Sequence, residues 1–322
     1  MLPNGIATEG HPRAAQPPRA QGSIRRTTSI DVLHVQGPPD HVQFTCEGRD
    51  LLTGRDGHET ISETSFTIAM TKPDGIVDSV VVPHSSSEVR RLVGTSLRRG
   101  FRKAVAEADV AQPGSITSQL LDDLPVALIV SGYSTAVAGA QVREQPNLDR
   151  IGVCMGWRQG GTVDLELARS GAIPIPHGPI VPAPEDHDAA AWHRLPSLDH
   201  HSVRRLRRTD VIRDIRGWRV EASFRDSHTD GTGIETVIHE YDLHAIVEFA
   251  TDEIVEAIAT PRVLPYLECP MAAAAVQNII GMPASDARRS IPSLISGTAS
   301  CTHLNDLLRT LADVPTLSSY LP

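Results

Sequence analysis

The sequence predicts an α+β protein whose two similar halves each contain a four-stranded antiparallel sheet followed by helices. Three observations lead to this prediction. Short motifs occur twice in the same order, strand-like segments precede helix-like segments in both halves, and hairpin signals join the strands. Strands that are joined by hairpins need no crossover helices, so the sheets are expected to be antiparallel. We expect the two halves to pack as a pseudo-dimer.

The motif pairs are separated by roughly 176 to 187 residues along the chain. The matched segments are 24–27 with 206–209, 49–50 with 225–226, 74–78 with 252–256, and 92–94 with 279–281. Collinear matches at a nearly constant separation indicate a tandem duplication.

The duplication divides the chain into four segments. Residues 1–22 lack hydrophobic periodicity and are expected to form a disordered arm. Residues 23–133 form the first half, which is diverged, and residues 204–322 form the second half. The intervening residues 134–203 are rich in proline and are expected to be an extended connector.

Each half is expected to place its strands before its helices. The expected strands are 29–36, 41–52, 61–71 and 76–82, followed by 211–215, 218–226, 235–249 and 254–260. Within 235–249, Tyr241 and Leu243 alternate with Glu240 and Asp242, which indicates one apolar and one polar face. Helices are expected over 85–108 and about 269–280, with further helices starting near Ser115 and Ser300.

Composition and charge favour a soluble, reduced, cytoplasmic protein. The net charge of −9 argues against a nucleic-acid-binding protein, which would carry a basic face. We found no apolar run long enough to span a bilayer and no signal-peptide pattern at the N-terminus. Four cysteines in 322 residues are too few for a disulfide framework. We therefore expect a small-molecule substrate and neither nucleic acid nor membrane as a partner. An oligomer is compatible with these observations.

The densest candidate site is residues 300–308. If Ser300 caps a helix, Cys301 and His303 fall in its first turn, where free N–H groups and the helix dipole favour a thiolate. Cys269 precedes Pro270, a residue that is favoured at the first position of a helix. The first half has no counterpart to these cysteines, so we expect the second half to carry the function.

Two functions remain open. In the first, the protein is a lyase or isomerase that needs no cofactor and acts on an organic acid or acyl compound. His303 would be the general base or acid, Cys301 would assist, and Cys269 and Asp226 would complete the site. In the second, the protein binds a metal or serves as an iron–sulfur scaffold through Cys269, Cys301 and His303. Metal bound to the purified protein would distinguish the two.

The second half also carries a set of motifs over roughly residues 200–320. They are Arg207-Arg208-Thr209, Phe224-Arg225-Asp226, Cys269-Pro270 and Cys301-Thr302-His303-Leu304. With these motifs the segment resembles an uncharacterised bacterial family, domain of unknown function 2889. That family has no established catalytic residues, so the resemblance implies no residue roles.

A fainter likeness connects the chain with iron–sulfur scaffold proteins of the NifU/IscU type. Those proteins also place antiparallel strands before helices and put cysteines at helix starts. The chain lacks their first Gly-Cys-Gly loop, and two candidate cysteines remain, Cys269 and Cys301. This likeness therefore bears on the fold more than on cluster assembly.

Overall fold

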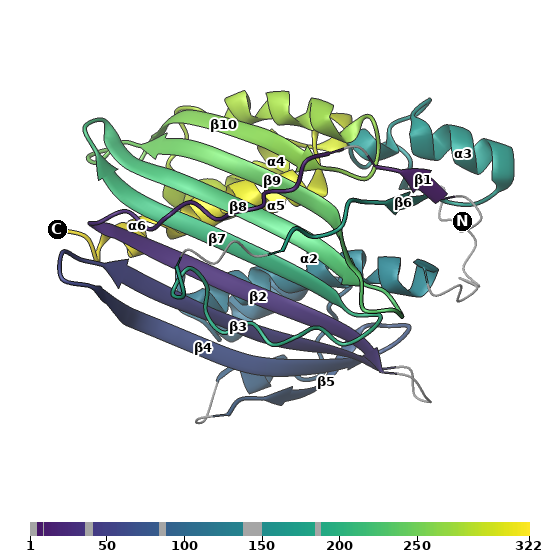
Figure 1. Cartoon of the computed structure of the whole chain (residues 1–322), viewed down its shortest axis with the longest axis horizontal. Helices are drawn as coiled ribbons and strands as arrows, with labels where there is room; N and C mark the ends of the chain where they lie inside the picture. The colour runs from purple at the N-terminus through teal and green to yellow at the C-terminus, as the bar shows by residue number, and fades with distance from the viewer. Residues whose placement is uncertain (1–4, 9, 36–40, 84–87, 138–149, 184–187) are drawn as a thin grey trace.

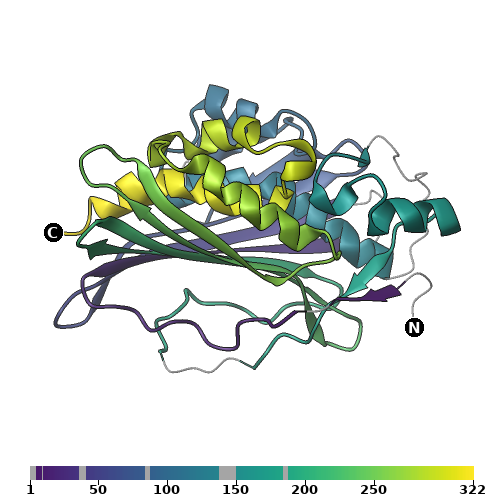
Figure 2. The same ribbon diagram turned by 90° about the horizontal axis from the view of Figure 1, so that it is seen from above.

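A single antiparallel sheet of eight strands organises the molecule. The computed structural model describes residues 5–8, 10–35, 41–83, 88–137, 150–183 and 188–322. The strand order is β10-β9-β8-β7-β2-β3-β4-β5. Helices cover one face of the sheet, and the N-terminal segment and the residues that precede β7 cross the other face (Figures 1 and 2). The expected α+β class is confirmed, but one continuous sheet replaces two separate ones.

The elements have the following bounds. The strands of the large sheet are β2 (Ser23–Val35), β3 (His41–Thr53), β4 (His58–Thr71), β5 (Ile76–Val81), β7 (Val203–Asp214), β8 (Gly217–Thr229), β9 (Glu235–Val247) and β10 (Ile254–Val263). A small parallel sheet joins β1 (Gly5–Ala7) to β6 (Ile175–His177). The α-helices are α1 (Phe101–Ala108), α2 (Ile116–Val137), α3 (Thr162–Ser170), α4 (Ala287–Leu294), α5 (Thr302–Arg309) and α6 (Val314–Ser318). The 3₁₀ helices are η1 (Glu88–Leu92), η3 (Met155–Trp157), η4 (Cys269–Ile279), η5 (Ala284–Asp286), η6 (Gly297–Ala299) and η7 (Thr310–Asp313).

Strands β2 and β7 pair at the centre of the sheet, so they join the first four strands to the last four. Two bidentate ion pairs cross this seam on the outer face: Arg25 donates to Asp210, and Arg204 donates to Asp31. Each strand thus supplies one arginine and one aspartate to the other. These buried charges lie between hydrogen-bonded strands and satisfy each other, as buried ions must.

Both central strands begin earlier than expected. β2 begins at Ser23 and β7 at Val203, where the sequence predicted residues 29 and 211. Their first residues include Arg25, Arg26 and Arg205, which are each 1% exposed. A charged run normally indicates a solvated segment, but here each guanidinium pairs with a carboxylate inside the fold.

The long helix expected over 85–108 is two shorter elements in the described residues, η1 and α1. Gly94 and Gly100 between them have φ of 86° and 69°, a left-handed conformation that interrupts a helix. The expected helix start at Ser85 lies outside the described residues.

The described part of the N-terminal arm is ordered against the outer face of the sheet, which differs from the expected disorder. Arg13 donates to Asp242 through its side chain and to Glu240 through its backbone N–H. Arg19 makes a bidentate pair with Asp188 of the connector. The connector, expected to be extended, also contains α3 and β6. Ion pairs hold the N-terminal segment in place, although its sequence has no hydrophobic periodicity.

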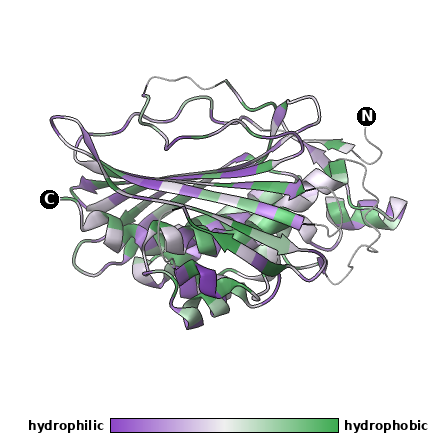
Figure 3. Ribbon diagram, turned by 90° about the horizontal axis from the view of Figure 1, so that it is seen from below, coloured by the Kyte–Doolittle hydropathy of each residue, from purple (hydrophilic) through white to green (hydrophobic). Residues whose placement is uncertain are grey.

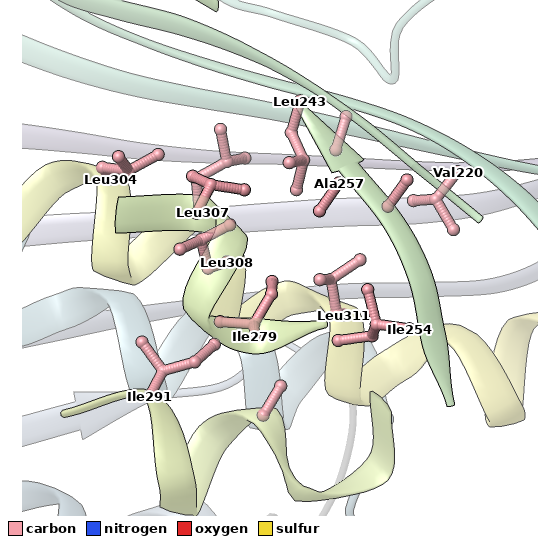
Figure 4. Close-up of a cluster of buried hydrophobic side chains, with 14 of the residues drawn as sticks. Val220, Leu243, Ile254, Ala257, Ile279, Ile291, Leu304, Leu307, Leu308 and Leu311 are labelled. Carbon is pink, nitrogen blue, oxygen red and sulfur yellow. The ribbon is translucent and has the colours of Figure 1, made fainter. Parts of the chain in front are cut away.

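The hydrophobic core lies between the sheet and the helices. Leu304, Leu307, Leu308 and Leu311 of the C-terminal helices pack with strand residues such as Leu243 (Figure 4). Hydrophilic residues also lie within the strands (Figure 3), in agreement with the buried arginines. The sequence was expected to contain no run able to span a bilayer, but in the described part of the chain α2 is long and apolar enough to do so. Of its most apolar window, 56% is buried, as in a core helix.

Candidate functional site

Two of the four predicted site residues, Asp226 and His303, lie together on the helical side of the sheet. Asp226 is on β8, and His303 is in the first turn of α5. His239 on the neighbouring strand β9 joins them, and one ligand atom from each of the three residues lies within 4.8 Å of the others. Cys269 and Cys301 are not part of this group. They form a second group at the starts of η4 and α5.

Asp226 and His239 are cross-strand neighbours directly before a β-bulge. The two residues are opposite each other in the β8–β9 ladder, and the register shifts directly after Asp226. His239 Nδ1 lies 3.3 Å from Asp226 Oδ2, although not in hydrogen-bond geometry. Asp226 is fully buried, and His239 is 7% exposed. The cross-strand pair therefore places a carboxylate and an imidazole nitrogen next to each other.

His303 stacks on this pair from α5. Its ring lies 3.6 Å from the His239 ring, centroid to centroid, at 22°, and 6.4 Å from the ring of Phe224. The residue is partly exposed, but its Nε2 is buried. Among the described residues, neither His303 Nε2 nor His239 Nδ1 has a hydrogen-bond partner. Two unsatisfied imidazole nitrogens next to a carboxylate require an explanation, because buried polar atoms are normally bonded.

Arg205 holds the carboxylate of Asp226 from the other side. Its Nε lies 2.7 Å from Oδ1 and its Nη2 lies 3.1 Å from Oδ2, while its Nη1 donates to Asp306 at 2.8 Å. Burial alone would raise the pKa of Asp226, but the Arg205 guanidinium and His239 outweigh burial and hold this pKa well below its usual range. Asp226 is therefore ionised and fixed in orientation.

His303 is neutral near pH 7. Burial of its ring and the neighbouring His239 lower its pKa well below the usual value, as do Arg205 and Arg207, while Asp226 opposes them. Burial is the largest of these causes. A neutral imidazole keeps a lone pair available for a proton or a metal ion.

The cysteines differ from the expected thiolates. Cys301 is the N-cap residue of α5, in place of Ser300, and the backbone N–H groups of His303 and Leu304 favour its thiolate. Burial nevertheless raises the pKa of Cys301 to about 11, so its thiol is protonated near pH 7. Burial and the nearby Cys301 likewise raise the pKa of Cys269. Desolvation outweighs the helix terminus because Cys301 is 4% exposed.

Three members of the site were not predicted from the sequence: His239, Arg205 and Arg207. His239 stands in the alternating pattern of β9 on the same face as Tyr241 and Leu243. A histidine among apolar residues on one face of a strand was the feature of the sequence that could have indicated His239 as a site residue. The two arginines flank Leu206 in β7, and their guanidinium carbons lie 5.3 and 5.4 Å from the Phe224 ring.

The donor set suits a transition-metal ion. Two imidazole nitrogens and one carboxylate are the ligands of many Fe²⁺ and Zn²⁺ sites. In such sites neighbouring ligand atoms are about 3 Å apart, because each lies about 2 Å from the metal. The 3.3 Å distance between His239 Nδ1 and Asp226 Oδ2 fits this spacing. The third candidate donor is the unsatisfied Nε2 of His303, which belongs to the group of ligand atoms within 4.8 Å of one another.

Fold and site together define an α+β protein with a buried His₂Asp cluster between its sheet and its helices. Residues 202–317 match the family model described as protein of unknown function (DUF2889). The segment contains Asp226, His239, Cys269, Cys301 and His303. No curated protein and no solved structure matches the chain, so the NifU/IscU likeness is not shown.

Proposed function

We propose that this protein binds a divalent transition-metal ion through Asp226, His239 and His303. This is the second function expected from the sequence, with His239 and Asp226 as ligands in place of Cys269 and Cys301. The observation that carries the proposal is the pair of unsatisfied imidazole nitrogens beside a buried carboxylate. Such an arrangement costs free energy in the metal-free protein, and a bound cation would recover it.

Arg205 would support the metal site from outside. It hydrogen-bonds both oxygens of Asp226 and so fixes the direction of the carboxylate. The three protein ligands leave coordination positions open, as in catalytic sites. A bound divalent ion would polarise a carbonyl or carboxylate oxygen. His303 is the partly exposed ligand, so substrate would approach from its side.

Titration of EDTA-treated protein with Zn²⁺ in a calorimeter tests the metal site. We expect one Zn²⁺ per chain, and we expect His239→Ala and His303→Ala to weaken binding by at least roughly 10- to 100-fold, since each removes a ligand. His244→Ala is the matched control, because His244 is on the same strand but pairs with Glu221 and Glu256. Unchanged affinity in His303→Ala, or no stoichiometric binding, would refute the proposal.

The second candidate is the lyase or isomerase without a cofactor, acting on an organic acid or acyl compound in the cytoplasm. The neutral His303 with its free Nε2 favours it, since such a group can accept a proton. His303 would be the base, Asp226 would orient His239, and Cys301 would assist as a protonated acid.

Proton exchange tests this second candidate without a known substrate. Organic acids incubated with the protein in D₂O would exchange protons next to the carboxylate, as followed by ¹H NMR. We expect His303→Ala to slow exchange by roughly 10²–10⁴-fold, while Ser118→Ala in α2 leaves it unchanged. Exchange that persists in EDTA and requires His303 would favour this candidate. Exchange that EDTA abolishes would favour the metal site.

We also propose that the two halves arose by tandem duplication. Three features support it: the reciprocal pairs Arg25–Asp210 and Arg204–Asp31, the pairs Arg26–Asp50 and Arg205–Asp226, and a register shift directly after both Asp50 and Asp226. These features align residues 25–26 with 204–205. The sequence match of 24–27 with 206–209 instead pairs residues 25–26 with 207–208, three residues further along. The two alignments differ because an Arg-Arg pair occurs twice in β7, at 204–205 and at 207–208.

A further inference from the structure

Arg207 has an unused hydrogen-bond donor inside the protein. Its side chain is 1% exposed. Nε donates to Asp123 at 2.5 Å and Nη2 to Asp306 at 3.4 Å, but the buried Nη1 has no partner in the described part of the chain. Arginine has five N–H donors, and leaving a buried guanidinium nitrogen unbonded is costly. This nitrogen is therefore a candidate contact for a ligand.

Arg207 and His303 of the proposed metal site both lie near the ring of Phe224. The guanidinium carbon of Arg207 lies 5.4 Å from the centroid of this ring, on which His303 also stacks. Arg207 is close enough to His303 to lower its pKa. Arg207 Nη1 and His303 Nε2 are thus two buried, unbonded nitrogens near the same ring.

Among the described residues, the ion pairs on the helical face of the sheet contain equal numbers of arginines and aspartates. On the helical face of the sheet the described ion pairs join six arginines to six aspartates. They are Arg26, Arg102, Arg205, Arg207, Arg288 and Arg309, with Asp50, Asp122, Asp123, Asp226, Asp306 and Asp313. A divalent cation would leave a buried excess of two positive charges. An anionic ligand would reduce that excess, as buried charges require compensation.

We propose that Nη1 of Arg207 binds a carboxylate group of the protein's ligand, next to the metal site. The inference rests on the proposed function, because the metal would supply the second contact for the same carboxylate. A carboxylate suits the site better than a phosphate. One free guanidinium nitrogen can satisfy one carboxylate oxygen, whereas a phosphate needs several donors for its oxygens.

Acetate is the probe for this inference, first on metal-free protein by ¹H–¹⁵N NMR and then on Co²⁺-loaded protein by its visible spectrum. We expect acetate to perturb both the NMR spectrum of the metal-free protein and the visible spectrum of the Co²⁺-loaded protein. Arg207→Gln should weaken acetate binding roughly 10- to 100-fold, because it removes one charge-assisted hydrogen bond. Arg102→Gln is the matched control. Arg102 also pairs with Asp306, so Arg102→Gln removes a positive charge beside the same carboxylate as Arg207→Gln does. Unlike Arg207, the Arg102 side chain is 37% exposed.

The outcomes separate the two proposals. If Co²⁺ binds but acetate acts equally on the wild type and Arg207→Gln, the inference is overturned and the metal site stands. If Co²⁺ does not bind, the metal proposal fails, and the metal-free titration alone decides whether Arg207 holds a carboxylate. Arg207→Lys guards against misfolding, because it keeps the charge beside Asp123. It should fold and still bind acetate more weakly than the wild type, and unaltered acetate binding in this variant would also overturn the inference.

Discussion

Cys154, Cys269 and Cys301 each stand at the start of a helix in the described structure. Cys154 is the N-cap residue of η3, Cys269 is the first residue of η4, and Cys301 is the N-cap residue of α5. At this scale two effects compete, since a helix N-terminus lowers a thiol pKa and burial raises it. Burial is the larger effect for all three residues. The sequence could show the helix starts, but not the desolvation.

Alkylation rates test this balance. Cys154 is partly exposed, whereas Cys46, Cys269 and Cys301 are buried. Brief treatment with iodoacetamide near pH 8, read by mass spectrometry, should therefore modify Cys154 before the other three, because both exposure and thiolate character control the rate. Cys154→Ser is the control and should leave little rapid modification. If Cys301 reacts as fast as Cys154, the helix terminus outweighs burial after all.

At the scale of elements, the connector is attached to the sheet through His193. Its Nδ1 lies 2.9 Å from Thr27 Oγ1 and its Nε2 lies 2.9 Å from Ser29 Oγ, both on β2. Burial, together with the nearby Arg49 and Arg204, lowers the pKa of His193 to about 4. The proline-rich composition predicted an extended segment here, but gave no sign that one buried histidine anchors it.

This contact predicts an acid-sensitive stability. The unfolded chain binds a proton at His193 below about pH 6.5, whereas the folded protein does so below about pH 4. Stability should therefore fall as the pH decreases between these values, by about 3 kcal/mol in total. Urea unfolding between pH 7 and pH 4.5 measures the effect.

His193→Gln is the variant that isolates this effect. It keeps a polar group beside Thr27 and Ser29 but cannot be protonated, so it should reduce the slope of stability against pH. His228, whose pKa burial also lowers to about 4, should account for part of the remaining slope. An identical slope in His193→Gln and the wild type would rule out His193 as a source of the acid sensitivity.

At the scale of the whole molecule, the candidate site in the second half depends on the first half. Arg207 pairs with Asp123, and Arg309 pairs with Asp122, both on α2. Arg102 of α1 pairs with Asp306. The sequence indicated which half carries Asp226 and His303, because their motifs are local. It could not indicate His239 or Arg207 as partners, because ladder register and packing between the halves bring them together.

The same contacts predict that the family segment does not fold alone as a monomer. Separation of residues 1–200 from 201–322 would remove β2 from β7 and break five pairs of buried or nearly buried charges: Arg25–Asp210, Arg204–Asp31, Arg26–Asp313, Arg207–Asp123 and Arg309–Asp122. Breaking one buried pair costs about 3–5 kcal/mol, and a whole domain is stable by only about 5–15 kcal/mol. Residues 201–322 alone should therefore be unfolded, aggregated or dimeric.

Co-expression of the two fragments should restore a 1:1 complex with the circular dichroism spectrum and melting temperature of the intact chain. Light scattering after gel filtration gives the stoichiometry. If 201–322 forms a folded dimer, a second copy of β7 would be taking the place of β2, as the proposed duplication expects. A 201–322 fragment that is monomeric and melts cooperatively would contradict the prediction, because the charges of the first half would then be unnecessary for the fold of the second.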